Sequence, residues 1–553
     1  MPIQQQAAPK LRRKKKHTGA VNGPILTLLM MVIGILLLMG VGFLLEMTKQ
    51  HSNRITTTAV SSSSSSLPHV SLLMNNKDGI PLLPIFAPIP NGKQRAAETL
   101  SGTPSMAGIV HILQTFLQKL RTSNLYLQQQ GVKDDQQVLE NFFRIAKQQL
   151  QPLENQYQGA SIFPIRDDDS IFISLAAYRE TLLSDTMEYA FSRAKHPEQL
   201  NVGAIVQNCF GTVREDGTID SSGNPCKTGL EVVGKNTMGR DQTKISDAPP
   251  DPNGVADFCS KPQFRKYCES GQVRVLYVHA SESLGPTMAR YYASKLWNGE
   301  TYFVQVDSHL QFAQDWDQKY IDELHATSNY PQSVLSSYPP GFSGHSSTAT
   351  VRESPGARLC SCETRADDPN PIVRINTGVG YHGGEAKPTQ IPFIAAGFFF
   401  ARSEFLMDVP FDPYLPWCFM GEEIALSLRA WTSGWNIYAP RKNLISHQYR
   451  PGRLGLPKFW ESVNQFWHKP SMNNLVQGKA IQRLKHMVGY PTASLQTIHA
   501  KGIDVILLDM EHYGVGKERT FQEYLEFANM QIDGRTQAIV CSRVDWCNQG
   551  LKD

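Results

Sequence analysis

Residues 301–309, Thr-Tyr-Phe-Val-Gln-Val-Asp-Ser-His, carry the sequence signal that decides the fold. The stretch opens with aromatic and β-branched residues, which predict a buried strand. Polarity then changes at Asp307 and His309, where a strand would give way to a loop. In open α/β sheets, ligands bind beyond the carboxyl ends of the strands. We therefore predict an α/β sheet whose edge carries a divalent-cation site at this Asp-x-His pair. A solvated turn is the alternative for such a pair taken alone.

Other apolar runs place further strands and helices around this stretch. Three short runs predict buried strands at residues 171–176, 202–206 and 273–278, and two later runs predict strands at 391–400 and 436–438. Helical patterns follow the first strand, Gly285-Pro286 and Gly421. Residues 211–262 and 327–371 have the composition of long polar insertions. The β-α-β order predicts a mostly parallel sheet flanked by helices.

Length and charge limit the class of protein. A chain of 553 residues predicts several units, and 41% hydrophobic with 19% charged residues is typical of a globular protein with a large core. The formal net charge is only +4, and the one dense basic run is at the N-terminus. We therefore predict no nucleic-acid partner.

The N-terminal region has the pattern of a membrane anchor. Basic residues between positions 10 and 16 precede an uncharged apolar segment, residues 25–45. At about 1.5 Å per residue, this segment spans a hydrocarbon layer of about 30 Å. The positive-inside rule then places residues 1–24 in the cytoplasm and the remaining chain in the lumen. A buried helix of a soluble protein is the alternative.

Composition divides the remaining chain. Residues 46–104 include an unbroken serine run at 61–66 followed by several prolines, which predicts a disordered stem. Residues 105–155 carry apolar positions at helical spacing. They predict either a helical neck, with self-association as one possibility, or helices that pack against the globular domain. That domain is predicted to span residues 168–470, and residues 471–553 to extend it.

All nine cysteines follow the predicted anchor. Three pairs have the spacing of loop-closing disulfides: Cys209 with Cys226, Cys259 with Cys268, and Cys541 with Cys547. Spacing alone does not determine the pairing, and an odd count leaves at least one cysteine without a partner in the chain. The sequence has no Cys-x-x-Cys pair, which argues against a structural zinc site.

Five short motifs occur in an order that matches a known family. They are Gly-Pro-Thr-Met-Ala-Arg ending at Arg290, Asp307-Ser308-His309, Trp316-Asp317, Gly421-Glu422-Glu423, and His447-Gln448-Tyr449-Arg450. Over residues 168–530 the chain resembles polypeptide and hydroxyproline α-N-acetylglucosaminyltransferases of the GT-A fold. It is more distantly similar to the polypeptide N-acetylgalactosaminyltransferases. The resemblance implies a GT-A domain that uses a nucleotide-sugar donor.

The resemblance also implies roles for particular side chains. Asp307, His309 and His447 would hold a divalent cation, Mn²⁺ by analogy, against the leaving diphosphate. The residues implied on the donor side are Tyr178, Arg179, Arg290 and Ser308. Taken without the family, His447 would be a surface or packing histidine and Arg290 a helix-surface arginine.

Glu422 and Glu423 are the implied catalytic residues, because one of them would face the donor sugar or the acceptor hydroxyl. The alternative is that both only complement a helix macrodipole. Trp316 and Asp317 are implied on the acceptor side, and a packed tryptophan is the alternative for Trp316.

The implied activity is transfer of N-acetylglucosamine from UDP-GlcNAc to a Thr, Ser or hydroxyproline hydroxyl of a protein, with retention of configuration. Family members that act on hydroxyproline are cytoplasmic, whereas this chain has a predicted anchor. We therefore expect a single-pass Golgi protein, with the endoplasmic reticulum as the alternative, acting on secretory proteins. Two other readings stay open: transfer of another UDP-sugar, and a luminal carbohydrate- or partner-binding protein without catalysis.

The anchor predicts a type II topology that protease protection tests. In intact microsomes, everything after residue 46 should resist added protease, because the lipid bilayer shields the lumen. Detergent should abolish this protection. Digestion of most of the chain in sealed vesicles would contradict the topology.

Overall fold

The computed structural model describes most of the chain after residue 104, namely residues 105–154, 163–210, 212–213, 219–220, 226–235, 241–248, 250–342, 351, 353, 356–365, 370–376, 378–379, 386–449, 472–541, 544, 546 and 547. These residues all belong to one compact unit, Asn76–Asp553. The predicted tail, anchor and stem, residues 1–104, lie outside the described residues, as do 450–471. Within the described ranges, no helix has the length and apolar character needed to cross a membrane.

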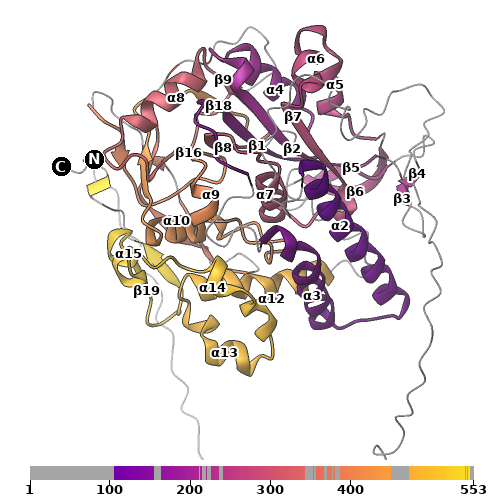
Figure 1. Ribbon diagram of the computed structural model, residues 1–553. Coiled ribbons are helices and arrows are strands. Elements are labelled where there is room, and N and C mark those ends of the chain that lie inside the picture. The colour runs from indigo at the N-terminus through magenta and orange to yellow at the C-terminus, as the bar shows by residue number, and fades with distance from the viewer. Residues whose placement is uncertain are drawn as a thin grey trace, which may run out of the picture. The chain divides into compact units, whose positions relative to one another are not determined.

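An eight-stranded sheet forms the centre of the unit (Figure 1). Its strands, in spatial order, are β15 (Thr389–Gln390), β17 (Asn436–Ala439), β10 (Ser333–Ser336), β16 (Phe398–Arg402), β8 (Tyr302–Val306), β1 (Ile171–Tyr178), β2 (Leu200–Asn208) and β7 (Val273–His279). Strands β8, β1, β2 and β7 run parallel to one another, as predicted. Strand β16 runs antiparallel to both β8 and β10, so the sheet is mixed.

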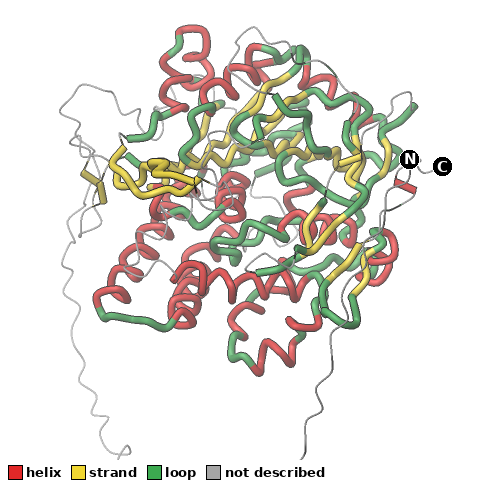
Figure 2. The backbone as a smooth tube through the Cα atoms, turned by 180° about the vertical axis from the view of Figure 1, so that it is seen from behind, coloured by secondary structure: helices red, strands yellow, loops and turns green. Residues whose placement is uncertain are grey.

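The sheet is buried on both faces, and the apolar side chains alternate between two core clusters. Phe172, Phe303 and Phe399 point to one cluster, whereas their immediate neighbours on the same strands belong to the other. Because both faces are covered, these strands read as continuous apolar runs. Helices lie on both sides of the sheet in two opposite views (Figures 1 and 2).

Helices of the two faces come from different parts of the chain. One cluster includes side chains from α4 (Leu183–Ser192), α5 (Gly254–Ser260), α6 (Pro262–Glu269) and α8 (Trp316–His325). The other includes side chains from α2 (Met106–Gln129), α3 (Asp135–Glu154), α7 (Pro286–Lys295), α9 (Phe405–Asp408), α10 (Glu422–Thr432), α12 (Met472–Met487), α13 (Leu495–Ala500), α14 (Met510–Tyr513) and α15 (Phe521–Phe527).

Helices α2 and α3 thus pack against the globular domain, which is one of the two readings of residues 105–155. Their apolar positions share a core with α7 and α12. Phe116 of α2, for example, lies 6.3 Å from Tyr292 of α7 between ring centroids. Lys147 of α3 pairs with Asp509 at 2.6 Å.

Two sequence expectations need correction. The apolar run at 391–400 is a strand only from Phe398 onward, because Ala395 bridges back to Phe398 before β16 pairs with β8. The predicted insertions contain regular structure. Residues 211–262 contain two ladders, β3 (Thr212–Val213) with β4 (Ile219–Asp220) and β5 (Cys226–Lys235) with β6 (Asp241–Ala248). Residues 327–371 contain β10 of the central sheet, and also β11 (Arg358–Leu359) and β12 (Cys362–Thr364), which pair with β14 (Gly378–Val379) and β13 (Val373–Ile375) just beyond the insertion. Outside the insertions, β9 (Leu310–Phe312) pairs with β18 (Ile445–His447), and β19 (Met530–Ile532) with β20 (Ile539–Cys541).

Disulfides connect the C-terminal segment to the second insertion. The Cys259–Cys268 pair forms as its spacing suggested. Cys541 and Cys547 do not pair with each other; they bond to Cys362 and Cys360, respectively. The spacing rule failed here because the tail folds back beside β12, which brings cysteines 179 and 187 residues apart into contact. Cys418 is a free, buried thiol.

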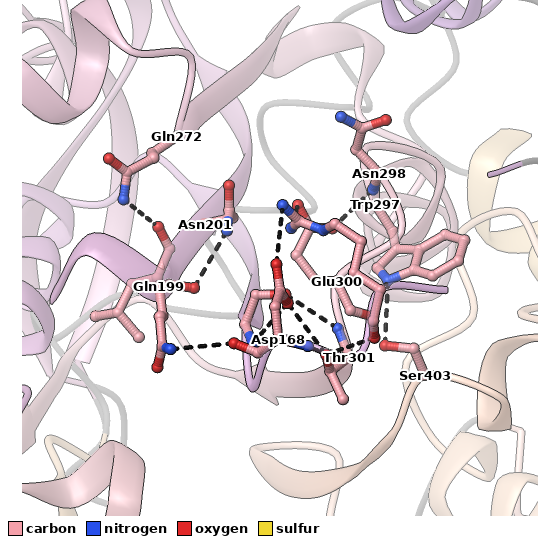
Figure 3. A network of polar contacts seen from close by, with 12 residues as sticks. Asp168, Gln199, Asn201, Gln272, Trp297, Asn298, Glu300, Thr301 and Ser403 are labelled. Carbon is pink, nitrogen blue, oxygen red and sulfur yellow. Dashed lines mark hydrogen bonds and ion pairs between the residues drawn. The ribbon is translucent and has the colours of Figure 1, made fainter. Parts of the chain in front are cut away.

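A buried ion-pair network connects the amino ends of the parallel strands (Figure 3). Glu300 is fully buried and contacts Arg274 at 2.5 Å and Arg166 at 3.0 Å. It also accepts a hydrogen bond from the Asn298 backbone at 2.7 Å. Thr301 donates to the backbone oxygen of Arg166 at 2.6 Å. This network holds the start of β8, the strand that ends at Asp307.

Replacing Glu300 by Ala should destabilise the protein by about 3–5 kcal/mol, because it leaves buried Arg274 without its counter-ion. Urea unfolding measures this loss. Glu198→Ala is the matched control, since that side chain is 68% exposed and its loss should cost less than about 0.5 kcal/mol. Equal midpoints for the two variants would contradict the assignment.

Candidate functional site

Two imidazoles and one carboxylate meet at the carboxyl end of β8. Asp307 directly follows that strand, and His309 comes two residues later. His447 ends β18, which pairs antiparallel with β9 so that His447 lies opposite Leu310. One residue further along, the Gln448 N–H donates a hydrogen bond to the His309 carbonyl oxygen at 3.1 Å. This short ladder brings His447 to the Asp-x-His turn from a distant part of the chain.

The three ligand atoms are close enough to hold one ion. They lie within 4.8 Å of one another. His447 Nε2 is 2.9 Å from Asp307 Oδ2, and the Nε2 atoms of His447 and His309 are 3.0 Å apart. Gly397 leaves room for this carboxylate, because a Cβ there would lie 3.0 Å from Asp307 Oδ2.

Glu180 orients His309. Its Oε2 accepts a hydrogen bond from His309 Nδ1 at 2.9 Å, while Oε1 accepts the Leu182 N–H at 2.9 Å. Burial alone would lower the pKa of His309, but the hydrogen bond to Glu180 and the charge of Asp307 raise it above its ordinary value. A histidine held by a carboxylate at Nδ1 presents Nε2 to a metal, which is the common arrangement at protein metal sites.

Arg290 joins the histidine cluster to α10. Its Nη1 contacts Glu422 Oε2 at 2.5 Å, and its Nη2 lies 3.5 Å from Asp307 Oδ1. Burial opposes ionisation of Asp307. The hydrogen bond from His447 and the positive charges of His309 and Arg290 outweigh burial and hold the pKa of Asp307 well below its usual range.

Gly421 sets the start of α10. Its φ of +86° is in the left-handed region, and a Cβ there would lie 2.4 Å from the Ile372 side chain. The glycine therefore allows Glu422 and Glu423 to occupy the first turn. Burial raises the pKa of Glu422, and Arg290 opposes this shift.

Glu423 has different neighbours from Glu422. Its Oε1 accepts the Ala396 N–H at 2.9 Å, and the Tyr338 hydroxyl lies 3.1 and 3.0 Å from the two carboxylate oxygens. Burial raises the pKa of Glu423 to about 7, and the negative charge of Glu422 also raises it. The hydrogen bonds from Ala396 and Tyr338 lower this pKa but do not cancel the increase. This carboxyl group is therefore able to gain or lose a proton near neutral pH.

The structure brings most of the predicted site residues to one edge of the sheet, with different roles. Tyr178 ends β1, and Arg179 follows it with a guanidinium that contacts Asp251 at 2.8 and 3.0 Å. These contacts anchor the loop that carries Glu180. Ser308 is buried, and its carbonyl accepts a hydrogen bond from Thr186 at 3.0 Å.

The side chains of Trp316 and Asp317 contact residues at the end of α4 and just beyond it, and not this cluster. Trp316 is fully buried and donates its indole N–H to the Ala190 carbonyl at 2.9 Å. Asp317 accepts the backbone N–H groups of Lys195 and His196 at 2.8 and 2.7 Å. Both side chains fasten α8 to the end of α4. The packed-tryptophan alternative describes Trp316.

Sequence reasoning missed Glu180 and Tyr338. Glu180 follows the first strand directly, so it was a carboxylate at the same predicted sheet edge, and this signal was available. Tyr338 gave no local signal, because its contact with Glu423 depends on the position of β10 beside β16. Arg450, the last residue of the final motif, lies outside the described residues.

Comparisons with known proteins identify one family and several distantly similar solved structures. The model of the family described as "Glycosyltransferase (GlcNAc)" matches residues 170–533. No curated protein matches the chain. Among solved structures, the chain is similar to GalNAc-T7 with UDP, GalNAc and Mn²⁺, with 13% identity and a TM-score of 0.34 over 69% of this chain and 56% of that chain. It is also similar to S. aureus TarS 1-349 with UDP-GlcNAc, with 10% identity and a TM-score of 0.29 over 68% and 97%. The chain thus spans little more than half of GalNAc-T7.

The raised pKa of Glu423 predicts a pH-dependent stability. A carboxyl group with a pKa of about 7 when folded and about 4.5 when unfolded favours the folded state at low pH. This contribution, on the order of 1–3 kcal/mol, should be lost as the pH rises through 7. Urea unfolding in chelator at pH 5.5 and 8.5 should therefore show Glu423→Gln gaining stability relative to the parent protein at the higher pH.

The other titrating groups are common to both proteins, so the difference between them isolates Glu423. A difference in unfolding free energy that did not change between the two pH values would contradict the shift.

Proposed function

The chain belongs to the Glycosyltransferase (GlcNAc) family, and on that premise we propose that it transfers N-acetylglucosamine from UDP-GlcNAc to a hydroxyl group of a protein. The observation that carries the proposal is the continuous cluster of Asp307, His309 and His447, joined through Arg290 to Glu422. The mixed sheet, with its ligand residues beyond the carboxyl ends of β1 and β8, is the arrangement expected for a GT-A transferase.

The cluster fits a divalent cation. One carboxylate oxygen and two imidazole nitrogens converge, and the carboxylate of Glu180 holds one imidazole in place. The two Nε2 atoms face each other at 3.0 Å, so without an ion one of them must donate a proton to the other or to Asp307. Manganese accepts this donor set, and as a Lewis acid it would neutralise the charge that develops on a departing diphosphate.

Arg290 is the protein's own positive charge at the donor side. Its guanidinium is buried and lies between Asp307 and Glu422, and these two acids raise the pKa of Arg290 against the effect of burial. A permanently charged guanidinium offers planar hydrogen bonds to diphosphate oxygens. We assign Arg290 to the diphosphate. We propose that Tyr178 and Arg179 lie beside the base and ribose of the donor.

Glu423 and Tyr338 form the acceptor side of the proposal. A carboxyl group with a pKa of about 7 is suited to orient an acceptor hydroxyl and to accept its proton. The Tyr338 hydroxyl fixes the direction of this carboxylate. The retaining course is proposed from the sequence resemblance, and no side chain is assigned as a nucleophile.

The acceptor is proposed to be a Thr, Ser or hydroxyproline hydroxyl of secretory proteins. This rests on the predicted anchor at 25–45, which would place the enzyme in the Golgi membrane with its transferase domain in the lumen.

Removing the metal ligands should remove Mn²⁺-dependent transfer. Asp307→Ala loses the charged ligand and should reduce transfer below detection. His309→Ala and His447→Ala should raise the Mn²⁺ concentration for half-maximal rate, and Glu180→Gln should weaken Mn²⁺ binding by about 10–100-fold. The measurements are calorimetric Mn²⁺ binding and a Mn²⁺ titration of UDP release from UDP-GlcNAc with acceptor peptides.

Exposed residues of the same types provide the controls. His111→Ala and Asp322→Ala should keep the parent's metal dependence. Full activity of the parent in excess chelator would remove the metal from the mechanism, and unchanged metal dependence in His447→Ala would remove that ligand.

A further inference from the structure

A small cavity lies behind the first turn of α10, on the side of the C-terminal segment. Its volume is about 30 Å³. Its polar lining comes from Thr287 of α7, Asp412, and Glu422 and Arg429 of α10. Apolar side chains, Ala425 and Leu484 among them, form other parts of its wall. Each of the four polar residues is at least nine-tenths buried.

Glu422 lines this cavity and has one unsatisfied carboxylate oxygen. Its Oε2 contacts Arg290, but Oε1 is buried and has no hydrogen-bond partner among the described residues. A buried carboxylate oxygen without a donor destabilises the folded protein, because the hydrogen bonds that it made to water are not replaced. Native proteins seldom leave such an atom unsatisfied, and an ordered water molecule is one of the usual partners.

The cavity has the size and chemistry of a water site. A water molecule needs at least about 10–15 Å³ of such volume and two to four polar partners. Glu422 and Asp412 offer acceptors, and Arg429 is a donor. Thr287 already donates to the Leu415 carbonyl at 2.7 Å, so it is left as an acceptor.

The far side of the cavity is held by the C-terminal segment. Asp412 accepts a hydrogen bond from Arg483 of α12 at 2.6 Å and from the Tyr414 N–H at 3.0 Å. Arg483 is fully buried and also donates to the Ile506 carbonyl at 2.6 Å. Asp412 is therefore fixed in position from outside the transferase site.

We propose that one ordered water molecule occupies this cavity, donates a hydrogen bond to Glu422 Oε1 and another to Asp412, and accepts one from Arg429. Glu422 is then a positioning residue that aims Arg290 at the diphosphate, and Glu423 alone of the pair faces the acceptor. The C-terminal segment, through Arg483 and Asp412, becomes part of the donor site. The assignment of Arg290 to the diphosphate rests on the proposed function.

Calorimetric measurement of UDP binding in the presence of Mn²⁺ distinguishes the role of Glu422 from that of Glu423. Glu422→Gln should weaken UDP binding by about 10–100-fold, the effect of weakening one charged hydrogen bond, and raise the donor KM more than it lowers kcat. Glu423→Gln should keep the parent's UDP affinity and lose transfer by about 10² or more. Equal effects of both variants on UDP affinity would overturn the division of roles.

A matched pair of substitutions tests the water itself. Ala425→Val adds two methyl groups at the cavity wall and should displace the water, so UDP affinity should fall as in Glu422→Gln. Ala430→Val makes the same change in α10 at a buried position that is not among the cavity-lining residues, and it should lower the Tm without changing UDP affinity. UDP affinity unchanged in a folded Ala425→Val protein would overturn the proposal.

A high-resolution crystal structure of the parent protein gives a readout that does not depend on donor binding. We expect an ordered water within hydrogen-bond distance of Glu422 Oε1, and a cavity without density there would refute the inference. If the water is present and the parent protein binds no UDP, the proposed function fails while the water site stands.

Discussion

The Arg290 guanidinium, placed between Asp307 and Glu422, is the contact on which the site depends. Burying these charges is tolerable only if each has a partner, because an isolated buried ion is very costly. Arg290 of α7 therefore fixes the carboxyl end of β8 in position relative to the first turn of α10. Glycine at positions 421 and 397 leaves room for this arrangement. A side chain at Gly421 would collide with Ile372, and one at Gly397 would crowd the Asp307 carboxylate.

The sheet provides the fixed frame for this contact. The buried network around Glu300 holds the amino end of β8, and Asp307 extends from the carboxyl end of the same five-residue strand. Antiparallel pairing with β16 brings Gly397 beside Asp307, and the β9–β18 ladder brings His447 beside His309. The candidate metal ligands are thus held by backbone hydrogen bonds from three separate segments, which would suit a site whose geometry must not change as charge develops.

The helices before and after the transferase sheet are part of the same core. Side chains of α2 and α3 pack with those of α7 and α12, and Lys147 reaches Asp509 in the C-terminal segment. Two disulfides fasten that segment to β12 and to the residues before it. The C-terminal segment in turn supplies Arg483, the partner of Asp412 behind Glu422. Regions that read as flanking extensions in the sequence therefore contribute to the rigidity of the site.

Arg290 and His447 became candidates only through the resemblance to a family. The sequence by itself determined the α/β class, the four parallel strands, the starts of α7 and α10, and Asp307 and His309 as candidates. These features depend on local patterns of hydrophobicity, β-branching and glycine, which are visible within a few residues. Glu180 was within reach of the same reasoning, because it follows a strand whose carboxyl end was already predicted.

Only the tertiary structure decided which distant residues meet. Tyr338 contacts Glu423 across 85 residues of sequence, and Cys541 pairs with Cys362 across 179. Trp316 packs away from the site, against Ala190, which is 126 residues away in the sequence. Strand order and the return of the tail create these contacts, and no local pattern encodes them. The different surroundings of Glu422 and Glu423 have the same cause: adjacent residues on a helix point about 100° apart, so their chemistry depends on what packs on each side.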